Sequence, residues 1–232
     1  MVTPNLKNDS AIQQTPLTFL SMLYISIMIT SIVLGGKMII THYGVVSAGS
    51  ITCSLWFVLC DIITEIYGLK AAYKIFKFAM ICELIFIMAS TFVLYAPYPS
   101  WWHGQGSYDF VLGNLPRVYL SQLVATVIAW FLNTYLISQW KVWWRGGHFW
   151  FRSICSSGAG EAIFTLVSLT LIMWGRVSNN ELYQMIILAG LWKLLTSTVC
   201  VIPATLIVFH LKKVEGLDVY DSNLNFKSFK QT

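Results

Sequence analysis

The feature that most constrains this chain is a series of long apolar runs that contain almost no charged side chains. From Met38 through Cys60, for example, His42 is the one acidic or basic residue. A helix needs about 20 mainly apolar residues to cross a hydrocarbon core about 30 Å thick. Six stretches meet this length, and they predict transmembrane helices at about residues 16–40, 47–67, 73–97, 116–138, 153–175 and 184–210.

The composition supports a membrane protein over a soluble one. Of the 232 residues, 56% are hydrophobic and 11% are charged, whereas soluble domains have about 45–50% and about 25%. A β-barrel would need short strands that alternate apolar and polar residues, and these runs are apolar on every side. We therefore expect an all-α integral membrane protein. Residues 1–15 would form an N-terminal tail, 16–210 the six-helix domain and 211–232 a C-terminal tail.

Two features of this arrangement can be read from the charges and the span count. The loops between the other spans contain few basic residues. The loops after the second, fourth and sixth spans are rich in them: Lys70, Lys74, Lys77, Lys141, Arg145, Arg152, Lys212 and Lys213. The positive-inside rule places these loops and both termini in the cytoplasm. Six spans also permit a three-plus-three inverted repeat, although the letters show no clear self-similarity.

A pair of carboxylates ends the second predicted span. Asp61 and Glu65 lie one helical turn apart and share a face with Phe57. A charge at mid-bilayer costs about 2.5–3.5 kcal/mol on insertion scales, so such residues are functional by default. We expect a functional role for Asp61, which lies deeper. For Glu65, nearer the interface, a simple ion pair with Lys70 or Lys74 is an equal alternative.

Further polar residues occur within the other spans. Glu161 and Lys193 lie on consecutive spans, eight or nine residues in from opposite sides, so their depths meet near the midplane. A structural ion pair and a ligand site are both open interpretations for them. Glu83 fits a protonated or hydrogen-bonded core acid, while Gln122 and Asn133 add neutral polar groups.

Catalytic and metal-binding patterns are missing from the sequence. The five cysteines and four histidines have no metal-ligand spacing. There is no glycine-rich loop for ATP and no evident nucleophile–base pair. We therefore expect neither an enzyme nor a cofactor.

Several stretches, taken in order, resemble the queuosine precursor transporter family, also described as vitamin-uptake-like. The matching stretches are "DIITEIYG" at 61–68, "LPRVYLSQLVA" at 115–125, "RSICSSGAGEA" at 152–162, "LWKLL" at 191–195 and "HLKKVEGLDVYDSNLNF" at 210–226. The resemblance covers about positions 25 to 230. It implies a six-helix inner-membrane importer of deazaguanine bases, which are salvaged for a modified tRNA nucleoside.

The resemblance also implies a set of binding residues. Asp61, Glu65, Arg117, Glu161 and Lys193 match the polar intramembrane residues of the family, and we add Phe57 and Gln122 as expected substrate contacts. Two positions depart from the family pattern, because Ile32 and Phe164 stand where polar residues are frequent. These replacements leave the preferred base open.

Partners follow from this function. We expect a deazapurine substrate, which presents two adjacent donors to a carboxylate, and the lipid bilayer, but no nucleic acid. A homodimer is left open. The rival function is a substrate-capture subunit of an energy-coupled vitamin importer, which would require a separate ATPase module.

The topology generates the first prediction. A reporter that is active only in the periplasm, fused after Lys213, should give no signal, because the basic loop before it is expected in the cytoplasm. The same reporter placed in the lysine-poor loop near Trp101 should be active. A strong signal after Lys213 would contradict the arrangement with both ends inside.

Overall fold

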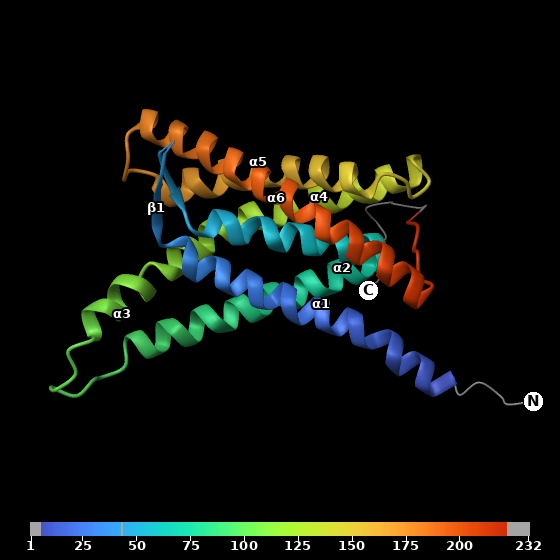
Figure 1. Cartoon of the computed structure of the whole chain (residues 1–232). Helices are drawn as coiled ribbons and strands as arrows, with labels where there is room; N and C mark the ends of the chain where they lie inside the picture. The colour runs from blue at the N-terminus through green and yellow to red at the C-terminus, as the bar shows by residue number, and fades with distance from the viewer. Residues whose placement is uncertain (1–5, 43, 222–232) are drawn as a thin grey trace, which may run out of the picture.

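The computed structural model describes residues 6–42 and 44–221. Helices and a short hairpin follow one another along the chain (Figure 1). Their bounds are α1 Leu6–Gly35, β1 Met38–Thr41, β2 Gly44–Ser47, α2 Gly49–Leu94, α3 Gln105–Leu112, α4 Leu115–Trp143, α5 Phe149–Met173 and α6 Asn179–Glu215. The expected all-α membrane fold is confirmed.

The longest helix, α2, contains a break. Within the described residues, five helices are long and apolar enough to cross a membrane, and α2 is one of them with 46 residues. Its backbone leaves the helical conformation at Gly68, where φ is 82° and ψ is 172°. Figure 1 shows the half after this residue running back in the opposite direction. The expected second and third spans thus lie within one bent helix, and the six-span count stays a prediction.

A β-hairpin replaces the predicted end of the first span. The span was expected to reach residue 40, but α1 ends at Gly35 and Met38 pairs with Ser47 in an antiparallel ladder. The Ser47 hydroxyl donates to the Gly35 carbonyl at 2.8 Å, so one of the last carbonyls of α1, which have no donor within the helix, is satisfied. Apolarity alone does not separate a short strand from a helix, so the sequence interpretation merged them. The short helix α3 was also not predicted.

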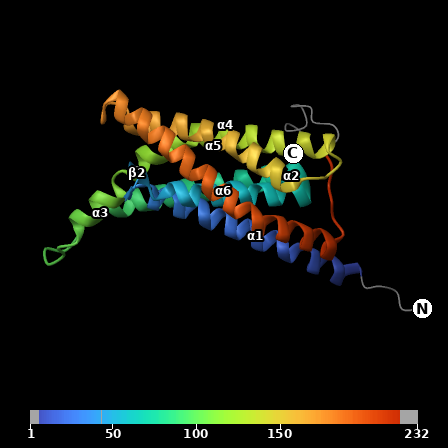
Figure 2. The same cartoon turned by 45° about the horizontal axis from the view of Figure 1, so that its top comes forward.

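Close packing holds the helices together. Helix α4 lies along α5, and α2 contacts α1 and α6 (Figure 2). The fully buried ring of Trp130 stacks on Phe76 with centroids 4.5 Å apart. A Cβ at Gly160 would lie 3.0 Å from the Phe57 ring and 3.1 Å from the Ala129 carbonyl. The small residues of α5 therefore allow α2 and α4 to approach it closely.

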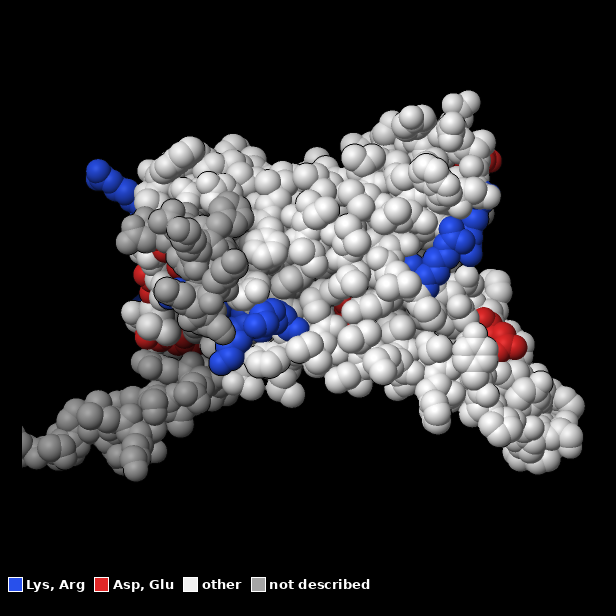
Figure 3. All heavy atoms as spheres, turned by 180° about the vertical axis from the view of Figure 1, so that it is seen from behind, with Lys and Arg blue, Asp and Glu red and all other residues white. Residues whose placement is uncertain are grey.

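The outer surface is apolar over its middle. Along α6, large side chains point outward from the bundle: Ile187, Leu191, Leu195, Val199, Ile202 and Leu206. On the face in Figure 3, charged side chains gather at the two ends and leave a wide band almost free of charge. Such a band matches the hydrocarbon of a bilayer.

The chain after α6 packs against the break in α2. The amide of Leu69 donates to the Asp221 carboxylate at 2.8 Å, and the amide of Val219 donates to the Ile66 carbonyl at 3.2 Å. The side chain of Val219 occupies the space beside Gly68, where a Cβ would meet its Cγ1 at 2.8 Å. We call residues 216–221 the docking segment.

This geometry generates the second prediction. Gly68→Ala should destabilise the fold by about 1–3 kcal/mol, because alanine is strained at positive φ and its methyl group collides with Val219. Gly190→Ala is the matched control, since a Cβ there meets nothing within 4 Å. Thermal unfolding in detergent measures both. Equal midpoints for the two variants would contradict the packing described.

Candidate functional site

Glu65 lies in a buried ion pair at the Gly68 end of the bundle. Arg152 donates to both of its carboxylate oxygens, at 2.9 and 3.0 Å, and Lys212 donates at 2.7 Å. Glu65 is 1% exposed and Arg152 is fully buried. The alternative pairing of Glu65 with Lys70 or Lys74 is therefore wrong, because the partners come from α5 and α6 across the bundle.

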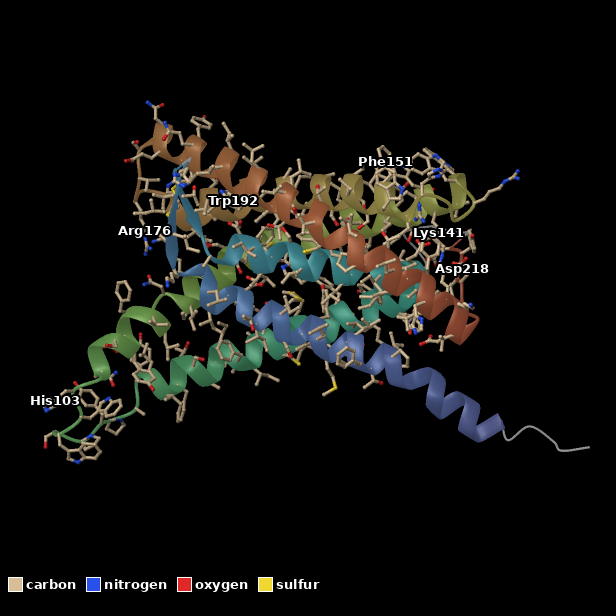
Figure 4. The ribbon with its side chains drawn as sticks, in the orientation of Figure 1. His103, Lys141, Phe151, Arg176, Trp192 and Asp218 are labelled. Atoms are coloured by element: carbon tan, nitrogen blue, oxygen red, sulfur yellow. The ribbon has the colours of Figure 1, made fainter. Side chains whose placement is uncertain are left out.

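The docking segment extends this pair into a network. Asp218 bridges Lys141 at 2.7 Å and Lys212 at 2.9 Å, and Figure 4 shows Lys141 and Asp218 close together. Lys141 also donates to the Val219 carbonyl at 2.6 Å. We call Glu65, Lys141, Arg152, Lys212 and Asp218 the ionic cluster. It joins α2, α4, α5, α6 and the docking segment.

The two lysines set the charge state of Asp218. Partial burial alone would raise its pKa, but the hydrogen bonds and positive charges of Lys141 and Lys212 outweigh burial and lower the pKa below 3.8. A lowered folded-state value means that this contact stabilises the protein above pH 3.8 and is lost only as the pH falls through the folded value. The network is thus intact at neutral pH.

The turn between α4 and α5 prepares the position of Arg152. Arg145, Gly146 and His148 all have positive φ, and this conformation turns backbone carbonyls inward. Arg152 donates to the carbonyls of Gly147 at 2.9 Å, Ile137 at 3.2 Å and Gly146 at 3.4 Å. The sequence interpretation counted Arg152 among the basic loop residues, and it missed this role because Glu65 lies 87 residues away in the chain.

Asp61 is buried among neutral donors. It accepts from Asn133 at 2.7 Å, Ser153 at 2.6 Å and Ser157 at 2.7 Å, and it is fully buried. No ion pair within the described residues includes Asp61. Phe57 continues the same face of α2 and packs on Gly160 of α5, so the face shared by Phe57 and Asp61 lies against α5.

Glu161 and Lys193 do not form the ion pair that was one of the two alternatives. Ser197 donates to one oxygen of Glu161 at 2.8 Å, and the other oxygen is buried without a partner. The Lys193 ammonium reaches one turn further along α5, where it donates to Thr165 at 2.9 Å and lies 4.3 Å from the Phe164 ring centre. Neutral groups therefore contact each charge directly, while the positive charge of Lys193 still acts on Glu161.

A cavity of about 640 Å³ opens at the hairpin end of the bundle. Its walls include the rings of Trp56 and Phe164. Its polar lining comes from several helices: Ser31, Ser50, Glu83, Asn114, Gln122, Thr126, Ser168, Arg176 and Lys193. Glu83 is 5% exposed and has no hydrogen-bond or ion-pair partner among the described residues. Its place in the cavity wall makes the Glu83 carboxyl available to groups inside the cavity.

The expected binding residues divide between this cavity and the helix contacts. Gln122 and Lys193 line the cavity. The cavity lining does not include the remaining five: Phe57, Asp61, Glu65, Arg117 and Glu161. Arg117 is exposed and donates to the Trp174 carbonyl at 3.2 Å, which ties the start of α4 to the end of α5.

Two cavity residues had other interpretations on sequence: Glu83 as a core acid, and Phe164 as a departure from the family pattern that leaves the preferred base open. The signal for Glu83 was present, because it is an acid inside an apolar run. Its lack of a partner required coordinates.

Comparison with protein families matches residues 47–208 to the model described as "putative vitamin uptake transporter". The chain belongs to this family. The expected resemblance, the membrane transporter class and the absence of enzyme chemistry are thereby confirmed. Comparisons with curated proteins and with solved structures give no match.

The ionic cluster of this transporter generates the third prediction. Glu65→Gln should destabilise the protein by about 3–5 kcal/mol, because it strands the buried charge of Arg152. Adding Arg152→Met should restore part of the loss. Glu181→Gln is the matched control, since Glu181 is exposed and glutamine keeps the capping box of α6.

Thermal unfolding in detergent and membrane abundance measure the effect. A double variant no more stable than the weaker single variant would mean that the pair is not the source of the stability.

Proposed function

We propose that this transporter imports a queuosine precursor, a deazaguanine-type base, for tRNA modification, and that the base binds in the cavity at the hairpin end. The observation that carries the proposal is Glu83, a buried acceptor without a partner in a wall that also holds aromatic rings. Glu83 takes the role that the sequence interpretation gave to Asp61, Glu65 and Glu161.

The chemistry of the cavity fits such a base. A guanine-type edge presents a ring N–H and an exocyclic amine side by side, and a carboxylate accepts both in a charge-assisted pair. Trp56 and Phe164 supply apolar faces for a flat ring. Lys193 donates to acceptors, and Gln122 both donates and accepts. The volume of about 640 Å³ is within the range of about 300–1,000 Å³ of small-molecule sites.

The charge distribution supports an orientation in the inner membrane. Lys70, Lys74 and Lys77 follow the break at Gly68, so the positive-inside rule places this end, and both termini, in the cytoplasm. The cavity then opens on the opposite side, where hairpin residues such as Val46 and Ser47 line it. The ionic cluster closes the cytoplasmic end. The described state would be one that accepts substrate from outside.

The partners in this proposal are the base and the bilayer, without nucleic acid. Uptake by the purified chain alone in vesicles separates the importer from a capture subunit that needs an ATPase module. Uptake only after an energising module is added would favour the capture subunit.

The fourth prediction concerns Glu83. Competition with labelled 7-deazaguanine uptake should rank deazaguanine bases and guanine first, hypoxanthine weaker and adenine weakest, because adenine turns an acceptor toward the carboxylate. Each lost bond to a charged group is worth about 1.5–3 kcal/mol, or about ten- to a hundredfold in affinity. Glu83→Gln should weaken deazaguanine binding by a similar factor and reduce the discrimination against adenine.

Asp109→Asn is the matched control, since Asp109 is exposed and bonds only to Gln105 among side chains. Its ranking should equal that of the parent. Equal inhibition of the parent by adenine and deazaguanine would overturn recognition by Glu83 while leaving the family assignment intact.

A further inference from the structure

Between the cavity and the ionic cluster, buried acids outnumber buried bases. Asp61 and Glu161 lie in this region, and Glu83 lines the cavity beside it. Of the three buried basic residues described, Arg152 and Lys141 belong to the ionic cluster, which leaves Lys193. Lys37 and Arg176 line the same cavity as Glu83, so the deficit concerns Asp61 and Glu161, which stand against Lys193 alone. Burial of an unpaired ion costs several kcal/mol, and a bound proton would neutralise the second acid.

The two acids between cavity and cluster lie on one continuous polar row. Ser153, Ser157 and Glu161 are spaced by four residues and share a face of α5. The two serines donate to Asp61, while Glu161 accepts from Ser197 of α6. Two buried acceptors in this row have no partner, namely Oε2 of Glu161 and Oδ1 of Asn133. These unpaired oxygens mark the place where positive charge is missing.

Charged and titratable groups face this row from three helices. Helix α2 contributes Glu65, Cys60 and Cys53, and α5 contributes Arg152. Helix α6 contributes Lys193 and Cys200. Helix α4 contributes the amide of Asn133, which does not titrate, and Tyr24 of α1 packs against Trp56 and lies near Cys60. Arg152 is held by Glu65 and Lys193 by Thr165, so neither neutralises Asp61 in this structure.

We propose that Asp61 and Glu161 form a proton-binding site through which uptake of the substrate is coupled to proton entry. This inference rests on the proposed import function. Three hydrogen-bond donors fill the space around the Asp61 oxygens and leave no open coordination position for Na⁺. A proton needs only one acceptor for the new O–H, which a serine hydroxyl turned to accept or the unpartnered Oδ1 of Asn133 can provide.

The site connects the cavity to the ionic cluster. Asp61 lies one turn from Glu65, and its partner Ser153 is adjacent to Arg152 in α5. Protonation of Asp61 removes a negative charge one turn from Glu65 and thereby strengthens the hold of Glu65 on Arg152, whereas loss of the proton weakens it.

The first experiment reads the proton site without any substrate. Dicyclohexylcarbodiimide reacts with protonated carboxyl groups in apolar surroundings, and mass spectrometry locates the modified residue. In purified protein free of Na⁺, labelling is expected at Asp61 or Glu161, and it should decline as the pH is raised. Asp61→Asn and Glu161→Gln should each remove label from the altered position, and Asp109→Asn should change nothing. No labelling at either acid, or protection by Na⁺, would overturn the proton site.

The second experiment measures coupling in vesicles that contain only this protein. With labelled 7-deazaguanine, an inward gradient of one pH unit should drive about tenfold accumulation at one proton per substrate, which corresponds to about 1.4 kcal/mol. Asp61→Asn should abolish this accumulation. Exchange of labelled for unlabelled base without gradient-driven accumulation in the parent protein would overturn coupling and leave import standing. Absence of exchange would overturn import, while the labelling experiment still reports on the site.

Discussion

Burial of charge is the constraint on which this structure depends. The Glu65–Arg152 pair is removed from solvent, bidentate and completed by three backbone carbonyls and Lys212. Such a pair is tolerated only when every donor has an acceptor. The turn before α5 places two carbonyls against Arg152. The docking segment places Asp218 against Lys212, which in turn donates to Glu65.

The two ends of the bundle contrast in how their polar groups are satisfied. At the Gly68 end, charges of opposite sign contact one another and the ionic cluster closes this end of the bundle. At the hairpin end, Glu83 and Lys193 line a cavity and take part in no ion pair among the described residues. Between the two ends, Asp61 and Glu161 are held by hydroxyl and amide groups of neighbouring helices. A bundle with one sealed end and one open, unsatisfied end has the asymmetry that transport requires.

Sequence reasoning predicted the helices and the family, because long apolar runs and ordered motifs are local signals. It also placed Phe57, Asp61 and Glu65 on one face, since helical spacing determines that relation. It did not find the hairpin, whose apolar strands resemble helix by composition alone. It misassigned the partner of Glu65 and passed over Glu83, because both depend on contacts between segments far apart in the chain. Arg152 was hidden for the same reason, with 87 residues separating it from Glu65.

The docking segment has a consequence for biogenesis. Ribosomes make the chain from its N-terminus, so Lys212, Asp218 and Asp221 emerge after every other part of the bundle. Until then, Glu65 and Arg152 can form their ion pair, but Lys141 lacks its partner Asp218. The amide of Leu69 lacks its acceptor, the Asp221 carboxylate. The sealed end is therefore assembled last, and a ribosome that stalls before residue 212 would leave in the bilayer a bundle whose closure has not yet formed.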